Sequence, residues 1–163
     1  MISNVKELGR VDLVHFFRWL GSLPVANKIN DSEWLFPVIE SIHITGLAIL
    51  VGTIVIVDLR LLGLTLRDRP ASQIAADLKR WTWAGIGIML TTGPLMLSAE
   101  PERGYGNPAF TFKMCCLLLA LVTHFTILRR ATRPGQSGGK FAACLSLALW
   151  TSVIFGGRAI AFF

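Results

Sequence analysis

The sequence predicts an all-α fold, an integral membrane four-helix bundle preceded by an interfacial amphipathic helix. Apolar residues make up 53% of the chain and charged residues only 16%. The apolar residues are gathered in four long blocks, and the cations stand in the short segments between them. Because a membrane-spanning helix needs about 20 predominantly apolar residues, each block can supply one span. These features exclude a soluble enzyme, a disordered chain and a disulfide-rich secreted domain.

The first segment, residues 1–34, precedes the predicted membrane domain. Residues 12–21 favour an amphipathic helix, whose apolar side chains at helical spacing are Leu13, Phe16, Phe17 and Leu20. This helix is too short and too charged to span, so we expect it to lie in the membrane interface. Residues 30–33 (Asn-Asp-Ser-Glu) are of the types that cap helices, and we expect them to begin the first span.

Residues 35–163 form the predicted four-span domain. The spans are expected over residues 35–62, 81–99, 108–128 and 141–162. Pro94 lies inside the second span and is expected to kink it, and residues 72–79 are expected to form a separate amphipathic stretch. Ala48 and Gly52 have the spacing of small residues that allows two helices to approach closely.

The positive charges predict the orientation of the chain. Most cations stand in the connections after the first and third spans, namely Arg60, Arg67, Arg69, Lys79, Arg80, Arg129, Arg130, Arg133 and Lys140. Cytoplasmic loops are enriched in Lys and Arg, so we expect a multi-pass protein of the bacterial inner membrane with both termini in the periplasm. The net charge of +6 then reflects topology. The expected partners are the lipid bilayer and other membrane-protein subunits, not nucleic acid.

Polar side chains from all four predicted spans fall in one layer of the outer half of the bilayer. They are Glu40 and His43, Met96, Lys113, and Arg158. Ionisable groups at this depth are costly and mark a site or a pairing. Imidazole and thioether groups ligate haem iron, and cations bind carboxylates such as the haem propionates. The pattern therefore predicts a b-type haem with His43 as iron ligand, Met96 as the candidate second ligand, and Lys113 and Arg158 near the propionates.

Two other interpretations of this layer stay open. It can be purely structural, with Glu40 paired to Lys113 or Arg158 in a cofactor-free subunit of a larger complex. It can also handle copper, because soft sulfur ligands suit Cu(I). The copper ligands would be His43, Met96, Met114 and Cys115. The sequence shows no nucleophile–base triad, which favours a non-catalytic or electron-transfer subunit over an enzyme.

Three further polar residues lie near the inner ends of the spans. His124 should lie about 15 Å deeper than His43, so one haem cannot be held between the two. We expect a structural hydrogen bond for His124, with a second haem or a proton relay as the alternatives. Asp58 and Arg60 flank the inner end of the first span and are expected to be interface anchors, with Arg60 reaching lipid headgroups.

Several motifs resemble those of a group of uncharacterised bacterial membrane proteins. This group is classified only as a domain of unknown function. The matching stretches are residues 34–46, 58–63, 92–93, 105–110, 113–114 and 157–160. The resemblance covers the chain from about Phe17 onward. It implies a four-helix membrane domain and carries no activity.

Shorter motifs are similar to two better known families. His43-Ile44-Thr45-Gly46, Thr92-Gly93 and Lys113-Met114 resemble CopD-type copper-resistance membrane proteins. His43, Lys113 and His124 resemble the first-helix His and third-helix Lys and His of HemJ-type protoporphyrinogen oxidases, which bind b-type haem. The Trp and Arg that follow the first-helix His in HemJ-type proteins are absent here. This second resemblance therefore implies haem binding more than porphyrinogen oxidation.

Overall fold

The computed structural model describes residues 14–128 and 138–162, and the regular structure in these ranges is helical. A short helix over residues 14–21 comes first. It is followed by α2 (Pro24–Asn30), α3 (Leu35–Leu62), α4 (Ala71–Ala99), η1 (Pro101–Arg103), α5 (Pro108–Thr123), η2 (His124–Leu128), α7 (Gly139–Ala159) and η3 (Ile160–Phe162). The segments η1 and η3 are 3₁₀-helices, whereas η2 is a π-helix that continues α5.

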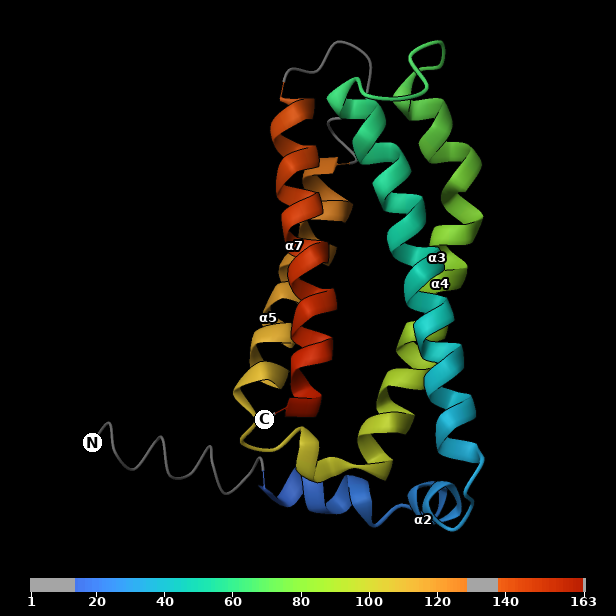
Figure 1. Ribbon diagram of the computed structural model, residues 1–163, viewed down its shortest axis with the longest axis vertical. Helices are drawn as coiled ribbons and strands as arrows, with labels where there is room; N and C mark the ends of the chain where they lie inside the picture. The colour runs from blue at the N-terminus through green and yellow to red at the C-terminus, as the bar shows by residue number, and fades with distance from the viewer. Residues whose placement is uncertain (1–13, 129–137, 163) are drawn as a thin grey trace, which may run out of the picture.

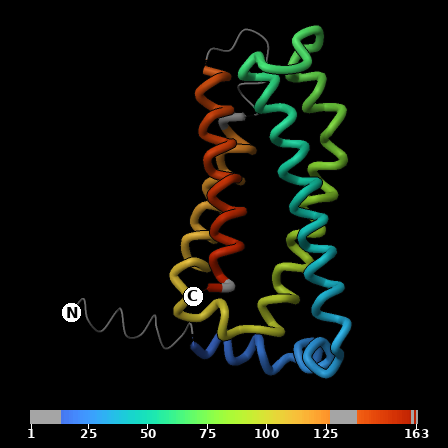
Figure 2. Tube along the Cα trace, viewed as in Figure 1, coloured from blue at the N-terminus to red at the C-terminus, as the bar shows by residue number. Residues whose placement is uncertain are grey.

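The four long helices form two antiparallel pairs, α3 with α4 and α5 with α7 (Figure 1). The two pairs are joined mainly by contacts between α3 and α7. Figure 2 shows that the pairs lie close together at the end where α3 finishes and α7 begins, and farther apart at the opposite end. The helix over residues 14–21 and α2 lie across that opposite end (Figure 1).

Three helices in the described part of the chain are long and apolar enough to cross a membrane. They are Leu35–Leu62, Pro108–Thr126 and Gly139–Ala159. They coincide, to within a few residues, with the first, third and fourth spans predicted from the sequence. Helix α4 is also long, at 29 residues, but is not among them, and its second half carries Thr91, Thr92, Gly93 and Pro94. The predicted all-helical fold with apolar helices is therefore confirmed.

The segment before α3 differs from the prediction. Pro24 begins an additional helix, α2, whose Ala26 and Ile29 are buried. Helix α3 begins after Trp34 without a side-chain cap, so the predicted role of residues 30–33 as its cap is wrong. The Asn30 side chain instead donates a hydrogen bond to the carbonyl of Ala99, 3.1 Å away, and so caps the end of α4.

Helix α4 begins ten residues earlier than the predicted second span. It starts at Ala71, directly after Pro70, and runs without a break through Trp81 and Pro94 to Ala99. The amphipathic stretch over residues 72–79 is thus the first part of α4 rather than a separate element. No glycine or proline stands between Ala71 and Trp81, so nothing in the sequence interrupts the helix there.

Two glycines allow α3 and α4 to pack closely. A Cβ at Gly46 would lie 2.4 Å from Cγ2 of Ile88, and a Cβ at Gly85 would lie 2.9 Å from the backbone nitrogen of Leu50. The small pair predicted to mediate such a contact, Ala48 and Gly52, is exposed instead, and a Cβ at Gly52 would meet nothing. The contact depends on small residues, as predicted, but on a different face of α3.

The centre of the bundle lies where the two helix pairs meet. Its buried residues are Leu50, Ile54, Ile86, Cys116, Ala120, Ala142, Trp150 and Val153. They come from all four long helices, so this cluster holds the two pairs together. At the opposite end the pairs diverge, and the polar residues predicted to form a site are found there.

Candidate functional site

His43 on α3 is half-buried and faces α4. Its Nδ1 lies 2.7 Å from Oγ1 of Thr92, a buried hydroxyl on α4. The next residue, Gly93, lies beside the ring, because a Cβ there would be in ordinary contact with Cε1 of His43, at 3.7 Å. The imidazole is therefore held between the two helices of the first pair.

The hydrogen bonds of Thr92 determine which ring nitrogen of His43 carries the proton. The Thr92 hydroxyl donates its only proton to the carbonyl of Ile88, 2.6 Å away. It can therefore only accept from His43, so Nδ1 is protonated and donates to Thr92. A neutral imidazole then has its lone pair on Nε2, which is left free to accept a proton or to bind a metal.

Lys113 on α5 approaches this imidazole from the second helix pair. It is half-buried and close enough to His43 to act on it electrostatically. Its side chain extends over Gly157 of α7, where a Cβ would lie 3.5 Å from Nζ. Gly157 therefore lies directly beside the end of the Lys113 side chain, and Lys113 and His43 are near enough to interact electrostatically.

The other predicted members of the site are less closely associated with His43. Met96 is half-buried one turn after Thr92 and on the same face of α4. Arg158 is exposed, with its guanidinium 5.2 Å from the centre of the Phe162 ring. Glu40 is exposed as well, and the ion pairs found among the described residues include none between Glu40 and Lys113 or Arg158. The expected pairing of these charges is therefore not formed.

A second group of polar side chains lies at the junction of α3 and α7. Asp58 is completely buried, and the Ser146 hydroxyl of α7 lies beside its carboxyl group. In the described part of the chain neither group makes a hydrogen bond of ordinary length and angle, and the same holds for the buried indole nitrogen of Trp150. The prediction that Asp58 is an interface anchor is wrong, because it lies on the same face of α3 as Leu50 and Ile54.

His124 and Arg60, which the sequence analysis expects near the inner ends of the spans, also have specific surroundings. His124 is the first residue of the π-helix η2 and packs edge-on against Phe125, with ring centres 5.2 Å apart. Arg60 donates to the backbone carbonyls of Arg69 and Arg67, at 2.6 and 3.3 Å. The predicted reach of Arg60 toward headgroups is thus replaced by a tie to the loop between α3 and α4. Arg129, Arg130 and Arg133 lie outside the described residues.

The described part of the chain offers candidate metal ligands singly, not in clusters. Within residues 14–128 and 138–162, no three His, Cys, Asp or Glu side chains come together in a way that could hold a metal ion. Cys115 and Met114, considered as copper ligands, are exposed on α5. His43 therefore stands out as the ligand-bearing group, with Nε2 as its available atom.

Comparison with known proteins identifies a family. The profile of a family of unknown function, DUF6644, matches residues 35–163, which include all four long helices. No curated protein and no solved structure matches the chain. The match therefore brings no activity, ligand or partner with it.

Proposed function

The chain belongs to this DUF6644 family of unknown function, and we propose that it is a four-span membrane subunit that holds a b-type haem on His43. Its role would be electron transfer or anchoring within a larger complex of the bacterial inner membrane. The argument rests first on how α4 is placed, then on the chemistry of His43, and then on the groups around it.

The packing of α4 supports a fourth span. Helix α4 runs antiparallel to α3 along most of its length (Figure 1), and α3 is one of the helices apolar enough to span. A helix of 29 residues is about 43 Å long, enough to cross the hydrocarbon core. Thr91 and Thr92 satisfy their hydroxyls on carbonyls of their own helix, which lowers the cost of placing them in lipid.

The orientation follows from where the cations lie. Arg60, Arg67, Arg69 and Arg80 stand where α3 ends and α4 begins, and Lys140 stands where α7 begins. This end of the bundle would face the cytoplasm. The site around His43 then lies in the outer half of the bilayer, and η3 and α2 lie at the periplasmic end.

The hydrogen bond between His43 and Thr92 is the observation that carries the proposal. Histidines that ligate metals almost always donate their other ring proton to a neighbouring group, which fixes the ring and its tautomer. Thr92 provides this acceptor, and its own proton is already used by Ile88. His43 is thus presented in the form that an axial ligand needs, with Nε2 unprotonated.

The surrounding residues fit the rest of a haem. Lys113, extended over Gly157, would provide a cation for a propionate carboxylate. The exposed Arg158 would provide a second one after leaving the ring of Phe162. Met96 shares the face of α4 that carries Thr92 and would be the candidate for a second protein ligand of the iron. Haem bound there would supply reversible one-electron transfer, while the chain holds, orients and shields it.

Absorption spectroscopy tests this proposal directly. The full-length protein, expressed with ample haem and purified in detergent, should show a Soret band that shifts on reduction with dithionite. His43→Ala should lose the band, and His15→Ala, which removes an exposed histidine of the helix over residues 14–21, should retain it. A featureless spectrum from the unaltered protein would overturn the haem proposal. Metal analysis would then separate a copper protein from a cofactor-free subunit.

A further inference from the structure

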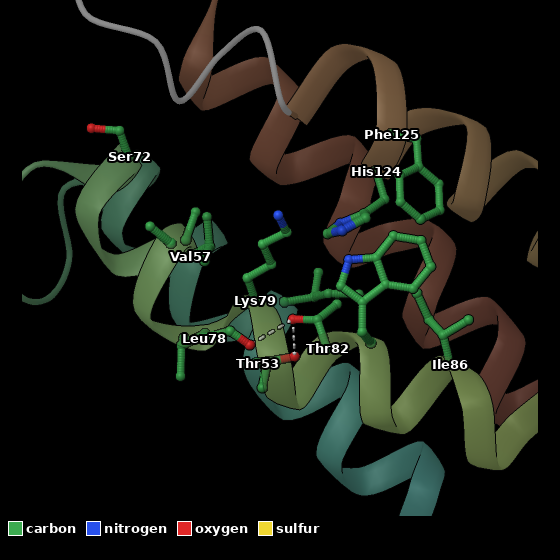
Figure 3. A pocket seen from close by; sticks show the side chains of 13 residues that line it. Thr53, Val57, Ser72, Leu78, Lys79, Thr82, Ile86, His124 and Phe125 are labelled. Atoms are coloured by element: carbon green, nitrogen blue, oxygen red, sulfur yellow. Dashed lines mark hydrogen bonds between the residues drawn. The ribbon is translucent and has the colours of Figure 1, made fainter.

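A cavity of about 350 Å³ lies between α3, α4 and η2, near the end of the bundle where the cations gather (Figure 3). It is separate from the site around His43. Thr53 and Val57 of α3 line it, and they stand 10 and 14 residues beyond His43, or about 15–20 Å along the helix. Its volume falls within the range of small-molecule sites.

The deeper walls of the cavity are apolar. Ile54, Val57 and Ile86 form one side, and the rings of Trp83 and Phe125 stack at a tilt with their centres 5.6 Å apart. Trp83 and its neighbour Trp81 are both about half exposed. Trp81 and Trp83 lie 10 and 12 residues into α4, directly after its charged residues Asp77, Lys79 and Arg80, and tryptophans at such a polar–apolar boundary are typical of headgroup depth. The cavity therefore spans the boundary between headgroups and acyl chains.

The polar groups that point into the cavity are cationic or proton-donating. Figure 3 shows the Lys79 amine and the His124 ring directed toward the same space, while the Ser72 hydroxyl points away from it. The threonines of the wall are engaged with each other and with their own helices. Thr82 donates to Thr53 at 3.0 Å, and Thr53 donates to the carbonyl of Leu50 at 2.8 Å. Lys79 and His124 are the polar side chains that Figure 3 shows directed into the cavity.

The charge of the lining favours an anion. Among the described residues that line the cavity, Lys79 is the one with a formal charge, and none carries a carboxylate. Neighbouring cations have other partners: Arg69 pairs with Asp77 at 3.3 Å, and Arg60 binds loop carbonyls. The buried carboxyl of Asp58 is not part of the lining, and its neighbour Ser146 is on α7. Lys79 is therefore the cation that the described lining offers to an anion.

The π-helix η2 shapes this cavity. A π segment inserts extra backbone into a turn, and such segments are frequently found at functional sites. Here the segment begins at His124, and it brings both His124 and Phe125 into the cavity wall. The π-helix, a feature of the backbone, thus lies at the same cavity as the Lys79 amine and the stacked rings of Trp83 and Phe125.

We propose that this cavity binds an acidic phospholipid of the cytoplasmic leaflet. Its phosphate would lie between Lys79 and His124, and its acyl chains would run past Trp83 and Phe125 along Ile86. Anionic lipids are concentrated in that leaflet, and basic pockets between membrane helices recognise their headgroups. The proposal rests on the membrane arrangement proposed above and is independent of whether haem is bound.

Native mass spectrometry of the delipidated full-length protein tests this site. Phosphatidylglycerol, phosphatidylethanolamine and inorganic phosphate are added separately. We expect a saturable phosphatidylglycerol adduct that phosphatidylethanolamine does not match and that millimolar phosphate does not displace. Lys79→Met should weaken it about five-fold, the contribution of one lysine at an anionic surface. Lys140→Met, which removes an exposed cation outside the lining, should leave it unchanged.

Each contrary result has its own meaning. Equal weakening of phosphatidylglycerol binding by Lys79→Met and Lys140→Met would show that only the overall charge of the protein matters. Equal binding of the two lipids would show that the cavity does not select for a negatively charged headgroup. Displacement by phosphate would make the ligand a small anion instead of a lipid. Each of these outcomes overturns the proposal. Resistance of the protein to alkaline extraction from membranes, measured in parallel, reports on membrane insertion, and the Soret band reports on haem.

Discussion

Helix α3 carries two polar groups whose surroundings differ in an informative way. His43 is half-buried, where the helix pairs lie apart, and its Nδ1 has a defined partner in Thr92. Asp58, about 22 Å further along the helix, is completely buried between α3 and α7. In the described part of the chain its carboxylate oxygens make no hydrogen bond of ordinary length and angle, although the Ser146 hydroxyl lies beside them. The first group is held in place with one atom left available for a ligand, whereas the second is inaccessible to any ligand. Accessibility combined with a fixed geometry, and not polarity alone, distinguishes a binding site from a packing feature.

The sharpest test of this contrast is the loss of haem. His43→Ala should abolish the Soret band completely, because it removes the proposed iron ligand. His124→Ala removes a histidine at the inner end of the bundle and should leave the band in place. Loss of the band in both variants would mean that the two ends of the bundle are not independent.

The partner of His43 should matter next. Thr92→Val keeps the size of the side chain but removes the acceptor for Nδ1, and loss of such a partner costs about 10–100-fold in metal affinity. Haem titration of the apoprotein measures this change. Thr91→Val is the matched control, because Thr91 is exposed and bonds only to carbonyls of its own helix. Equal haem affinities of Thr92→Val and Thr91→Val would show that Thr92 does not contribute to the site.

The close contact beside His43 should be sensitive to a single methyl group. Gly46→Ala places a Cβ 2.4 Å from Ile88, whose carbonyl accepts from Thr92, so we expect a loss of about 1–3 kcal/mol in thermal unfolding. Gly52→Ala has nothing within 4 Å and should be neutral or stabilising, since alanine is the better helix former. Similar unfolding temperatures for the two variants would contradict the packing described for α3 and α4.

Substitution of the buried Asp58 should raise the stability of the protein, whereas Gly46→Ala should lower it. Asp58→Asn removes the cost of burying a carboxylate that has no good partner, and we expect a stabilisation of about 1 kcal/mol. Glu40→Gln changes an exposed carboxylate on the same helix and should have little effect. If Asp58→Asn destabilised the protein or reduced assembly, the carboxylate would have a role beyond packing. Differential scanning fluorimetry in detergent measures both variants.

We expect the smallest effect on stability from the coupling between Glu40 and Lys113. Since Glu40 forms no ion pair with Lys113, a double-mutant cycle of Glu40→Gln and Lys113→Met should give a coupling energy within about 0.5 kcal/mol of zero. The cycle is read from unfolding of the four proteins under identical conditions. A larger coupling would restore the interpretation of this layer as a set of structural ion pairs.

The predictability of this fold differs between its long and short elements. The first span was predicted over residues 35–62, and α3 has these bounds because the apolar block ends in a glycine with positive φ, Gly63. Helix α2 was missed because its seven residues carry no long apolar run, and only its place against the rest of the protein buries Ala26 and Ile29. Local composition therefore predicts the long helices well and the short tertiary elements poorly.

The candidate site was predictable only in part. His43 and Lys113 were found because ionisable groups inside apolar blocks are rare. Thr92 was not identified as the partner of His43, since that depends on the register between α3 and α4, which the contact of Gly46 with Ile88 fixes in space. The burial of Asp58 could have been found from its spacing to Ile54 and Leu50, but its charge suggested an interface.

The close approach of α3 and α4 also has a consequence for how the chain is made. With its threonines, glycines and proline, α4 is a weak candidate to leave the translocation machinery for lipid by itself, whereas α3 is a strong one. Because Gly46 and Gly85 allow the backbones to meet, the two can enter the bilayer together as a helical hairpin, with the Thr92 hydroxyl already bonded to Ile88. The polar half of the proposed site would then be carried into the membrane by the apolar helix that precedes it.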